Sequence, residues 1–250
     1  MEPCNICGNA RFKPAPLGRL TPAGLPPACT ACGSLERHRA FRSIFNTYRS
    51  PRFKEWSCLM FSKDPSVATG WFGRFEYSIF GTATGLDVQA IDRPSRSFDV
   101  VVCNHVLEHV SDYRRALREI GRITTPGGFA FISFPNPKAR ALTDDWGYPK
   151  PEQHGHYRIF GRDVEEVFKA ELPDFHALRA SGRDPSTGET DIAYILTRSD
   201  DRFAEVFERG VAAKVAAIRQ SGPAASSRES SGGPDRRSMD GRQAAVATAI

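Results

Sequence analysis

The sequence has no long apolar run and little excess of charge of either sign. No stretch reaches the ~18–20 apolar residues that a membrane-spanning helix needs, and the N-terminus lacks the apolar segment of a signal peptide. We therefore expect a cytoplasmic protein without a membrane span. The formal net charge of +5 is modest and the arginines are dispersed, so a nucleic-acid-binding protein is disfavoured.

Cysteine is scarce outside the N-terminus. Four of the six cysteines lie in the first 32 residues, and the other two, Cys58 and Cys103, fall in predicted buried strands. In a cytoplasmic chain this distribution favours metal binding over disulfides.

The four early cysteines form two Cys-x-x-Cys pairs separated by 21 residues, each pair followed by glycine: Cys4, Cys7, Cys29 and Cys32. Four thiolates complete a closed tetrahedral zinc site, and the Pro- and Gly-rich segment between the pairs has few residues for a core. A catalytic zinc needs an open position, and a redox Cys-x-x-Cys usually occurs singly. We predict a structural zinc ribbon over residues 1–34.

A linking helix is predicted over residues 35–50, with Ser34 as its N-cap. Its basic cluster is interpreted as a solvated helix face rather than a binding site. The cluster comprises Arg37, His38, Arg39 and Arg42.

The segment from Phe98 to Pro135 predicts a strand, a helix and a second strand. A β-branched run over 98–103 indicates a buried strand, apolar residues at helical spacing follow, and Pro126-Gly127-Gly128 is expected to stop the helix. This order implies a right-handed parallel crossover, with ligands beyond the carboxyl ends of the strands.

The runs FDVVVCNHVLEHV, ALREIGRI and PGG together resemble the class I S-adenosylmethionine-dependent methyltransferases, most closely the type 11 group. The resemblance covers roughly residues 58–198, and a Cys-x-x-Cys pair followed by GSLERHR resembles the ribbon attached to some members. It implies an α/β fold: a Rossmann-like, mostly parallel sheet with an antiparallel last strand, over residues 51–200. A C-terminal helix over 201–220 and a disordered tail over 221–250 complete the predicted organisation.

The resemblance implies S-adenosylmethionine as cofactor, but the loop after the first strand lacks the usual Gly-x-Gly. It carries Phe61, Ser62, Lys63 and Asp64 instead. We expect Phe61 and Asp64 to border the cofactor, with Asp64 receiving its ammonium group. The alternative is a plain turn in which Ser66 caps a helix. The usual ribose-binding acid after the second strand (74–80) is not evident either.

Asp87 and Val88 inherit the adenine-binding role by resemblance; the alternative for Asp87 is a loop acid in an Asx-turn. Asn104 and His105 leave the strand over 98–103 and should border the cofactor. A metal site on His105 and His109 would need a third ligand and a helix through both histidines, so we expect Glu108 and His109 to fix the turn by hydrogen bonds.

Residues 136–162 predict a long loop over the cofactor edge. Within it, His156 is a candidate general base because its unperturbed pKa lies near 6.5. Alternatively, His156 and Arg158 only pin the loop.

Two functions follow from these observations. The first is a methyltransferase acting on an unidentified acceptor, with a small molecule, glycan or lipid favoured over nucleic acid. The alternative is a catalytically inactive methyltransferase fold that serves as a zinc-ribbon interaction module, which the missing Gly-x-Gly and ribose acid favour.

Overall fold

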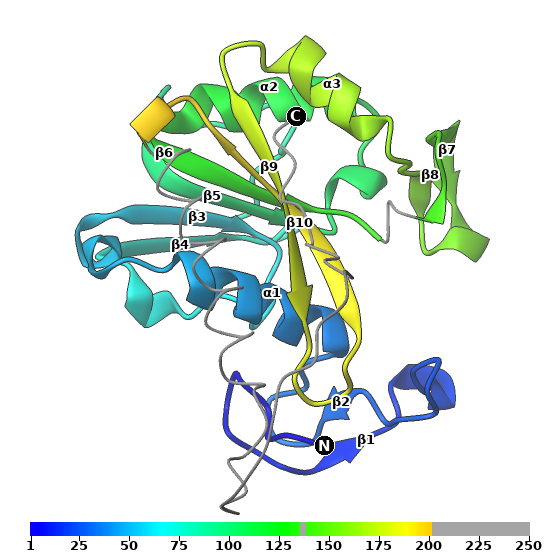
Figure 1. Cartoon of the computed structure of the whole chain (residues 1–250). Helices are drawn as coiled ribbons and strands as arrows, with labels where there is room; N and C mark the ends of the chain where they lie inside the picture. Colours follow the sequence, from blue (N-terminus) through cyan, green and yellow to red (C-terminus); the bar gives the residue numbers. More distant parts are fainter. Residues whose placement is uncertain (136–138, 202–250) are drawn as a thin grey trace, which may run out of the picture.

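A six-stranded sheet forms the centre of the molecule in the computed structural model, which describes residues 1–135 and 139–201 (Figure 1). The strands, in the order in which they pair, are β4 (Arg74–Ser78), β3 (Ser57–Phe61), β5 (Phe98–Asn104), β6 (Thr124–Ser133), β10 (Thr190–Thr197) and β9 (His176–Arg183). The first four are parallel, and β10 runs antiparallel to both of its neighbours. The predicted Rossmann-like sheet with an antiparallel last strand is confirmed.

Helices cover both faces of this sheet. Helix α1 (Glu36–Tyr48) packs on one face, while α2 (Tyr113–Ile123) and α3 (Val164–Glu171) pack on the other. Successive residues of β3 alternate between these two cores, since Leu59 belongs to the α2 side and Met60 to the α1 side. Two-sided burial explains the continuous apolar runs within the central strands β3, β5 and β6.

Helix α2 leads directly into β6. Its N-cap is Asp112, whose side chain accepts a hydrogen bond from the Arg115 amide at 2.9 Å. The helix ends at Ile123, so Pro126-Gly127-Gly128 lies inside β6 and does not stop the helix as expected. A Cβ at Gly128 would lie 2.2 Å from the carbonyl oxygen of Asp99, which accounts for a glycine there.

The two segments that connect β4 to its neighbours in the chain contain few regular elements. Only the 3-10 turn η3 (Thr69–Trp71) lies between β3 and β4, and residues 79–97 between β4 and β5, all of them described, contain no helix. The alternative in which Ser66 caps a helix is wrong, since no α-helix lies in this fully described stretch. No α-helix therefore comes directly before or directly after β4 in the chain.

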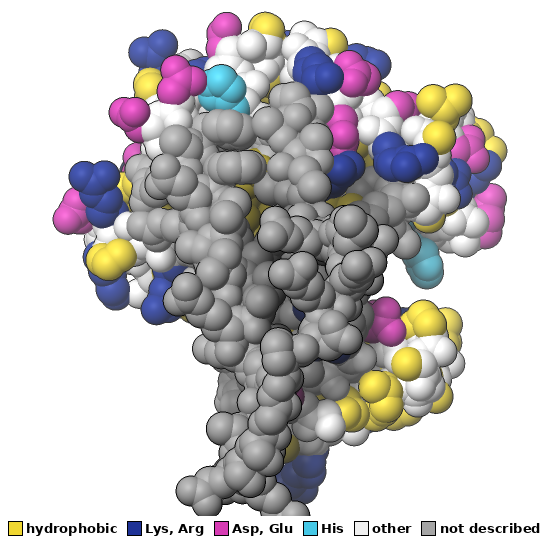
Figure 2. All heavy atoms as spheres, viewed as in Figure 1, with side chains coloured by type: hydrophobic (Ala, Val, Ile, Leu, Met, Phe, Trp, Pro, Cys, Tyr) yellow, Lys and Arg dark blue, Asp and Glu magenta, His cyan; other side chains and the backbone are white. Residues whose placement is uncertain are grey.

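The N-terminal ribbon consists of a two-stranded antiparallel sheet, β1 (Phe12–Lys13) and β2 (Ala28–Cys29), with the 3-10 turn η1 (Pro16–Gly18) between them. Hydrophobic side chains gather on its outer surface in Figure 2, among them the exposed Leu17 and Leu20.

The ribbon is tied to the sheet through Arg39 of α1. Its guanidinium is fully buried, pairs with both carboxylate oxygens of Asp184 in the β9–β10 turn at 2.8 and 2.7 Å, and donates to the carbonyls of Ser34 and Pro27. The interpretation of this cluster as a solvated face is wrong for Arg39 and for Arg42, which is also buried. Nor does Ser34 cap α1, whose N-cap is Leu35.

The remaining short elements are η2 (Pro51–Glu55), η4 (Leu107–His109), η6 (Pro151–Gln153) and the antiparallel hairpin of β7 (Asp144–Lys150) and β8 (His156–Ile159). Much of the predicted long loop over 136–162 is thus a hairpin. Among the described residues, no helix is both long and apolar enough to cross a membrane. Apart from residue 201, the predicted C-terminal helix and tail lie outside the described residues.

Candidate functional site

Two adjoining cavities lie at the carboxyl ends of the parallel strands β3, β4 and β5. The first has a volume of about 580 Å³ and a largely apolar lining, and the second has a volume of about 640 Å³ and is lined mainly by charged and polar side chains. Both include the same four residues in their walls: Ser62, Lys63, His105 and His109. Ligands in the two cavities would therefore lie next to each other.

The apolar cavity brings together four of the predicted cofactor residues, Phe61, Asp87, Val88 and His105. Val88 is buried, whereas Asp87 is exposed and its Oδ1 accepts a hydrogen bond from the Gln89 amide at 2.8 Å. This is the Asx-turn of the alternative interpretation. Both hydrogen bonds that the Asp87 side chain accepts from Gln89 use Oδ1, and Asp87 also lines the cavity.

The loop after β3 keeps a glycine-like backbone without glycine. Ser62 has φ 65°, and its amide donates to the carbonyl of Ser78 at 2.9 Å. Positive φ in a residue other than glycine is rare and occurs most often at functional positions. The sequence gives no signal for this conformation, because serine does not demand it.

The predicted residues Asp64 and Asn104 line the polar cavity and are bonded to each other. Asn104 donates from Nδ2 to Oδ2 of Asp64 at 2.9 Å and accepts a hydrogen bond from the Ser133 hydroxyl at 3.0 Å. The other oxygen of Asp64 accepts from the Ser66 amide at 2.7 Å. These bonds fix the loop against β5 and β6, so Asp64 has both a structural contact and a position at the cavity.

Glu108 lies buried at the base of the polar cavity. Its side chain is 1% exposed, and neither carboxylate oxygen has a hydrogen-bond partner among the described residues. Burial raises the pKa of Glu108 to about 8. The expectation that Glu108 fixes the turn by hydrogen bonds is therefore wrong.

His105 lies next to Glu108, and its backbone is in the left-handed region, with φ 52°. Its Nδ1 is 3.5 Å from Oε1 of Glu108, too far for a good hydrogen bond. Burial, together with the charges of Arg37 and His38, lowers the pKa of His105 to about 3, so the imidazole is neutral at pH 7.

The β7–β8 hairpin brings His156 to this cluster. The rings of His156 and His109 meet edge to face, with centroids 4.6 Å apart. Burial and the neighbouring His109 and His154 lower the pKa of His156 to about 4. The predicted base thus lies in the polar cavity, in its neutral form at pH 7.

Arg158 holds the hairpin in this position. Its side chain is 1% exposed, donates to the carbonyls of Leu107, Val110 and Ser111, and pairs with Asp145 at 2.8 Å. Arg158 therefore holds this segment in place, as the alternative interpretation of the loop predicted. The sequence showed the arginine but not the three carbonyls, which belong to a turn nearly fifty residues earlier.

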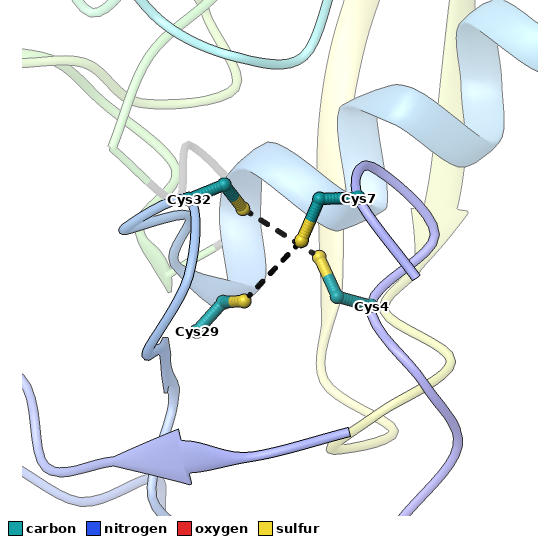
Figure 3. A group of neighbouring side chains, drawn as sticks. All are labelled: Cys4, Cys7, Cys29 and Cys32. Atoms are coloured by element: carbon teal, nitrogen blue, oxygen red, sulfur yellow. Dashed lines mark hydrogen bonds between the residues drawn. The ribbon is translucent and has the colours of Figure 1, made fainter. Parts of the chain in front are cut away.

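The four N-terminal cysteines converge, with their sulfur atoms directed at one point (Figure 3). Sγ of Cys4 and Cys32 are 3.8 Å apart, and those of Cys7 and Cys29 are 3.6 Å apart. A tetrahedral zinc with Zn–S bonds of about 2.3 Å would have sulfur–sulfur edges of about 3.8 Å. The thiols therefore fit one zinc ion.

Each Cys-x-x-Cys pair forms the same turn. The amides of Gly8 and Gly33 donate to the carbonyls of Cys4 and Cys29 at 2.8 and 3.0 Å. Both glycines have positive φ, 77° and 70°. Glycine is needed here because the left-handed conformation is strained for other residues.

The sheet topology is that of the class I methyltransferase fold, and comparison with known proteins finds chains that are similar to this one. The family model described as "Methyltransferase domain" matches residues 55–170, a little under half of the chain. Uncharacterized methyltransferases of Mycobacterium tuberculosis (strain H37Rv) and Mycobacterium bovis are each 40% identical over 55 residues. The matched stretch is 22% of this chain and 28% of the length of those relatives.

Solved structures with a similar fold are more distant in sequence. A Burkholderia thailandensis 1,6-didemethyltoxoflavin-N1-methyltransferase with bound S-adenosylhomocysteine is 16% identical, covering 64% of this chain and 79% of its own, with a TM-score of 0.43. A possible histamine N-methyltransferase from Thermotoga maritima is 15% identical, covering 65% of this chain and 91% of its own, with a TM-score of 0.41.

Proposed function

We propose that this chain transfers the methyl group of S-adenosylmethionine to a small-molecule acceptor and carries a structural zinc ion in its N-terminal ribbon. The observation that carries the proposal is the pair of adjoining cavities at the carboxyl edge of a methyltransferase domain. Ligands of open α/β sheets bind at this edge. The reactive methyl belongs to the cofactor, and the protein has to align the acceptor with it.

The apolar cavity suits the adenosine part of the cofactor. Its volume and apolar lining are those of an ordinary cofactor site. Val88 offers an apolar surface for adenine, and the free carboxylate oxygen of Asp87 can accept a hydrogen bond from the cofactor. In this arrangement the methionine part extends past Ser62 toward Asp64, whose carboxylate attracts the ammonium group.

The polar cavity suits the acceptor. It shares the Ser62 and His105 walls with the cofactor cavity, so an acceptor there faces the sulfonium methyl. An oxygen or nitrogen acceptor that needs to lose a proton finds neutral His156 beside it. Undiminished turnover in His156→Ala, once an acceptor is found, would remove this role.

The zinc ion has a structural role in this proposal. Four thiolates occupy all its coordination positions, so it can hold the two knuckle turns together but not bind a substrate. The ribbon then fixes the N-terminal end of α1, and this helix contributes Arg37 and His38 to the lining of the polar cavity.

Calorimetric titration of the zinc-loaded protein with S-adenosylmethionine and S-adenosylhomocysteine tests the cofactor. We expect micromolar binding, roughly −8 kcal/mol, and at least tenfold weaker binding in Asp87→Ala because one charge-assisted hydrogen bond is lost. Asp174→Ala, an exposed acid away from both cavities, is the matched control and should bind normally.

Each outcome has a distinct meaning. Unchanged affinity in Asp87→Ala would show that Asp87 does not contact the cofactor. No cofactor binding to the folded wild-type protein would overturn the proposed methyltransferase activity. It would support the alternative, an inactive methyltransferase fold acting as a zinc-ribbon interaction module.

A further inference from the structure

We propose that Glu108, His109 and His156 bind a divalent transition-metal ion in the polar cavity. One ligand atom from each of the three residues lies within 4.8 Å of the others. The three come from two segments, the η4 turn and strand β8, and all three line the same cavity. This site is separate from the four-cysteine cluster.

The buried carboxylate of Glu108 is the independent observation that points to a ligand. Its side chain is 1% exposed, and both oxygens lack a hydrogen-bond partner among the described residues. A buried polar group without a partner normally destabilises a fold, and a charged group does so more strongly. A bound cation would supply the missing partner for this carboxylate.

The donor set indicates the type of ion. Two imidazoles and one carboxylate suit ions such as Zn²⁺, Co²⁺ or Fe²⁺, whereas Mg²⁺ and Ca²⁺ prefer oxygen ligands. Three protein ligands leave at least one position for water or substrate. Because the three residues line the polar cavity, an open position would be accessible from it.

Neighbouring contacts hold the ligands in place. Arg158 bonds to the carbonyls of Leu107 and Val110, which flank Glu108 and His109, and it lies two residues after His156 on β8. One buried side chain thereby connects both segments of the site. Positioning of this kind typically affects metal affinity 10- to 100-fold.

The ion also suggests the class of acceptor, an inference that depends on the proposed function. An acceptor hydroxyl bound to the ion would lose its proton to solvent more readily. Its oxygen would then form a bond to the methyl carbon as the sulfur–methyl bond breaks, leaving S-adenosylhomocysteine. In the metal-loaded protein the nitrogen lone pair of His156 would be directed at the ion, so its proposed general-base role would apply only to the metal-free protein.

Cobalt titration of the full-length, zinc-loaded protein in the absence of cofactor tests the site. We expect one Co²⁺ per chain with the weak visible bands of nitrogen and oxygen ligation. Absence of the intense thiolate-to-cobalt band would show that the ribbon keeps its zinc. Glu108→Gln and His156→Ala should each weaken this binding at least tenfold.

His154→Asn is the matched control. His154 lies beside His156, with ring centroids 6.0 Å apart, but is not one of the three ligands. Asparagine tolerates the left-handed backbone at this position. Equal cobalt affinity in wild type, Glu108→Gln and His156→Ala, or no binding beyond the ribbon, would overturn the proposal. Because no cofactor is present, this result is independent of S-adenosylmethionine binding.

Discussion

The four-cysteine cluster and the Glu108 cluster differ in how the chain brings their side chains together. Each cysteine pair is made by one short turn, and the two turns repeat the same hydrogen bonds. Glu108 and His109 lie on η4, whereas His156 arrives on a hairpin held by a buried arginine. The first cluster is closed and encoded locally; the second is open to a cavity and assembled by the tertiary fold.

The largest effect is expected from removing one ligand of the four-cysteine cluster. Cys29→Ser should abolish zinc binding by the ribbon and make residues 1–34 susceptible to proteolysis, because this segment has little core of its own and structural zinc contributes its binding free energy to folding. Zinc content and limited proteolysis measure both effects.

Ala31→Ser, within the same knuckle turn but not a ligand, is the control and should keep its zinc. Full zinc retention in Cys29→Ser would show that the four thiols do not form one site. The cobalt site at Glu108 should persist in Cys29→Ser if the two clusters are independent.

The contrast explains what the sequence could predict. The clustering of the four cysteines followed from residue type and spacing within two short turns. The sheet followed from apolar runs, with β5 read from the β-branched residues over 98–103. Asn104 and His105 were placed at the cofactor edge because they follow the predicted strand over 98–103, and the structure puts both in cavity walls.

The misses concern contacts between distant segments. Glu108 was expected to bond within its own turn, and the sequence does not show that it is buried or that β8 brings His156 close to it. Arg39 looked solvated because its partner, Asp184, is 145 residues away. A helix capped by Ser66 was one alternative for the loop after β3, and the structure has only the short turn η3 between β3 and β4.

An intermediate effect on stability is expected from removing the ion pair that connects α1, next to the ribbon, with the β9–β10 turn. Asp184→Asn leaves the buried charge of Arg39 without its partner, which should lower the free energy of unfolding by roughly 3–5 kcal/mol at pH 7. Chemical denaturation measures this difference. Glu166→Gln removes an exposed pair with Lys169 and should change stability by less than about 1 kcal/mol.

The same pair predicts a pH dependence. Burial alone would raise the pKa of Asp184, but the hydrogen bonds from Arg39, Thr187 and Ser186 lower it below the usual 3.8. A carboxyl with a depressed pKa in the folded state stabilises the protein above its unfolded pKa, and that stabilisation is lost as pH falls through the folded pKa. The stability gap between wild type and Asp184→Asn should therefore be constant near neutral pH and shrink below about pH 4. A gap that stays constant at acid pH would argue against the ion pair.

The smallest effect is expected from a substitution of Arg158, which tests whether the Glu108 cluster needs the β7–β8 hairpin to be held in place. Arg158→Lys keeps the positive charge but loses the planar fork that reaches three carbonyls, so the hairpin should hold His156 less firmly. We expect 10- to 100-fold weaker cobalt binding at Glu108 with unchanged zinc in the ribbon. Arg162→Lys, an exposed arginine of the same segment, is the control. Equal cobalt affinity in Arg158→Lys would mean that the three ligands do not need the hairpin fixed, and the contrast between a locally encoded and a fold-assembled site would lose its main support.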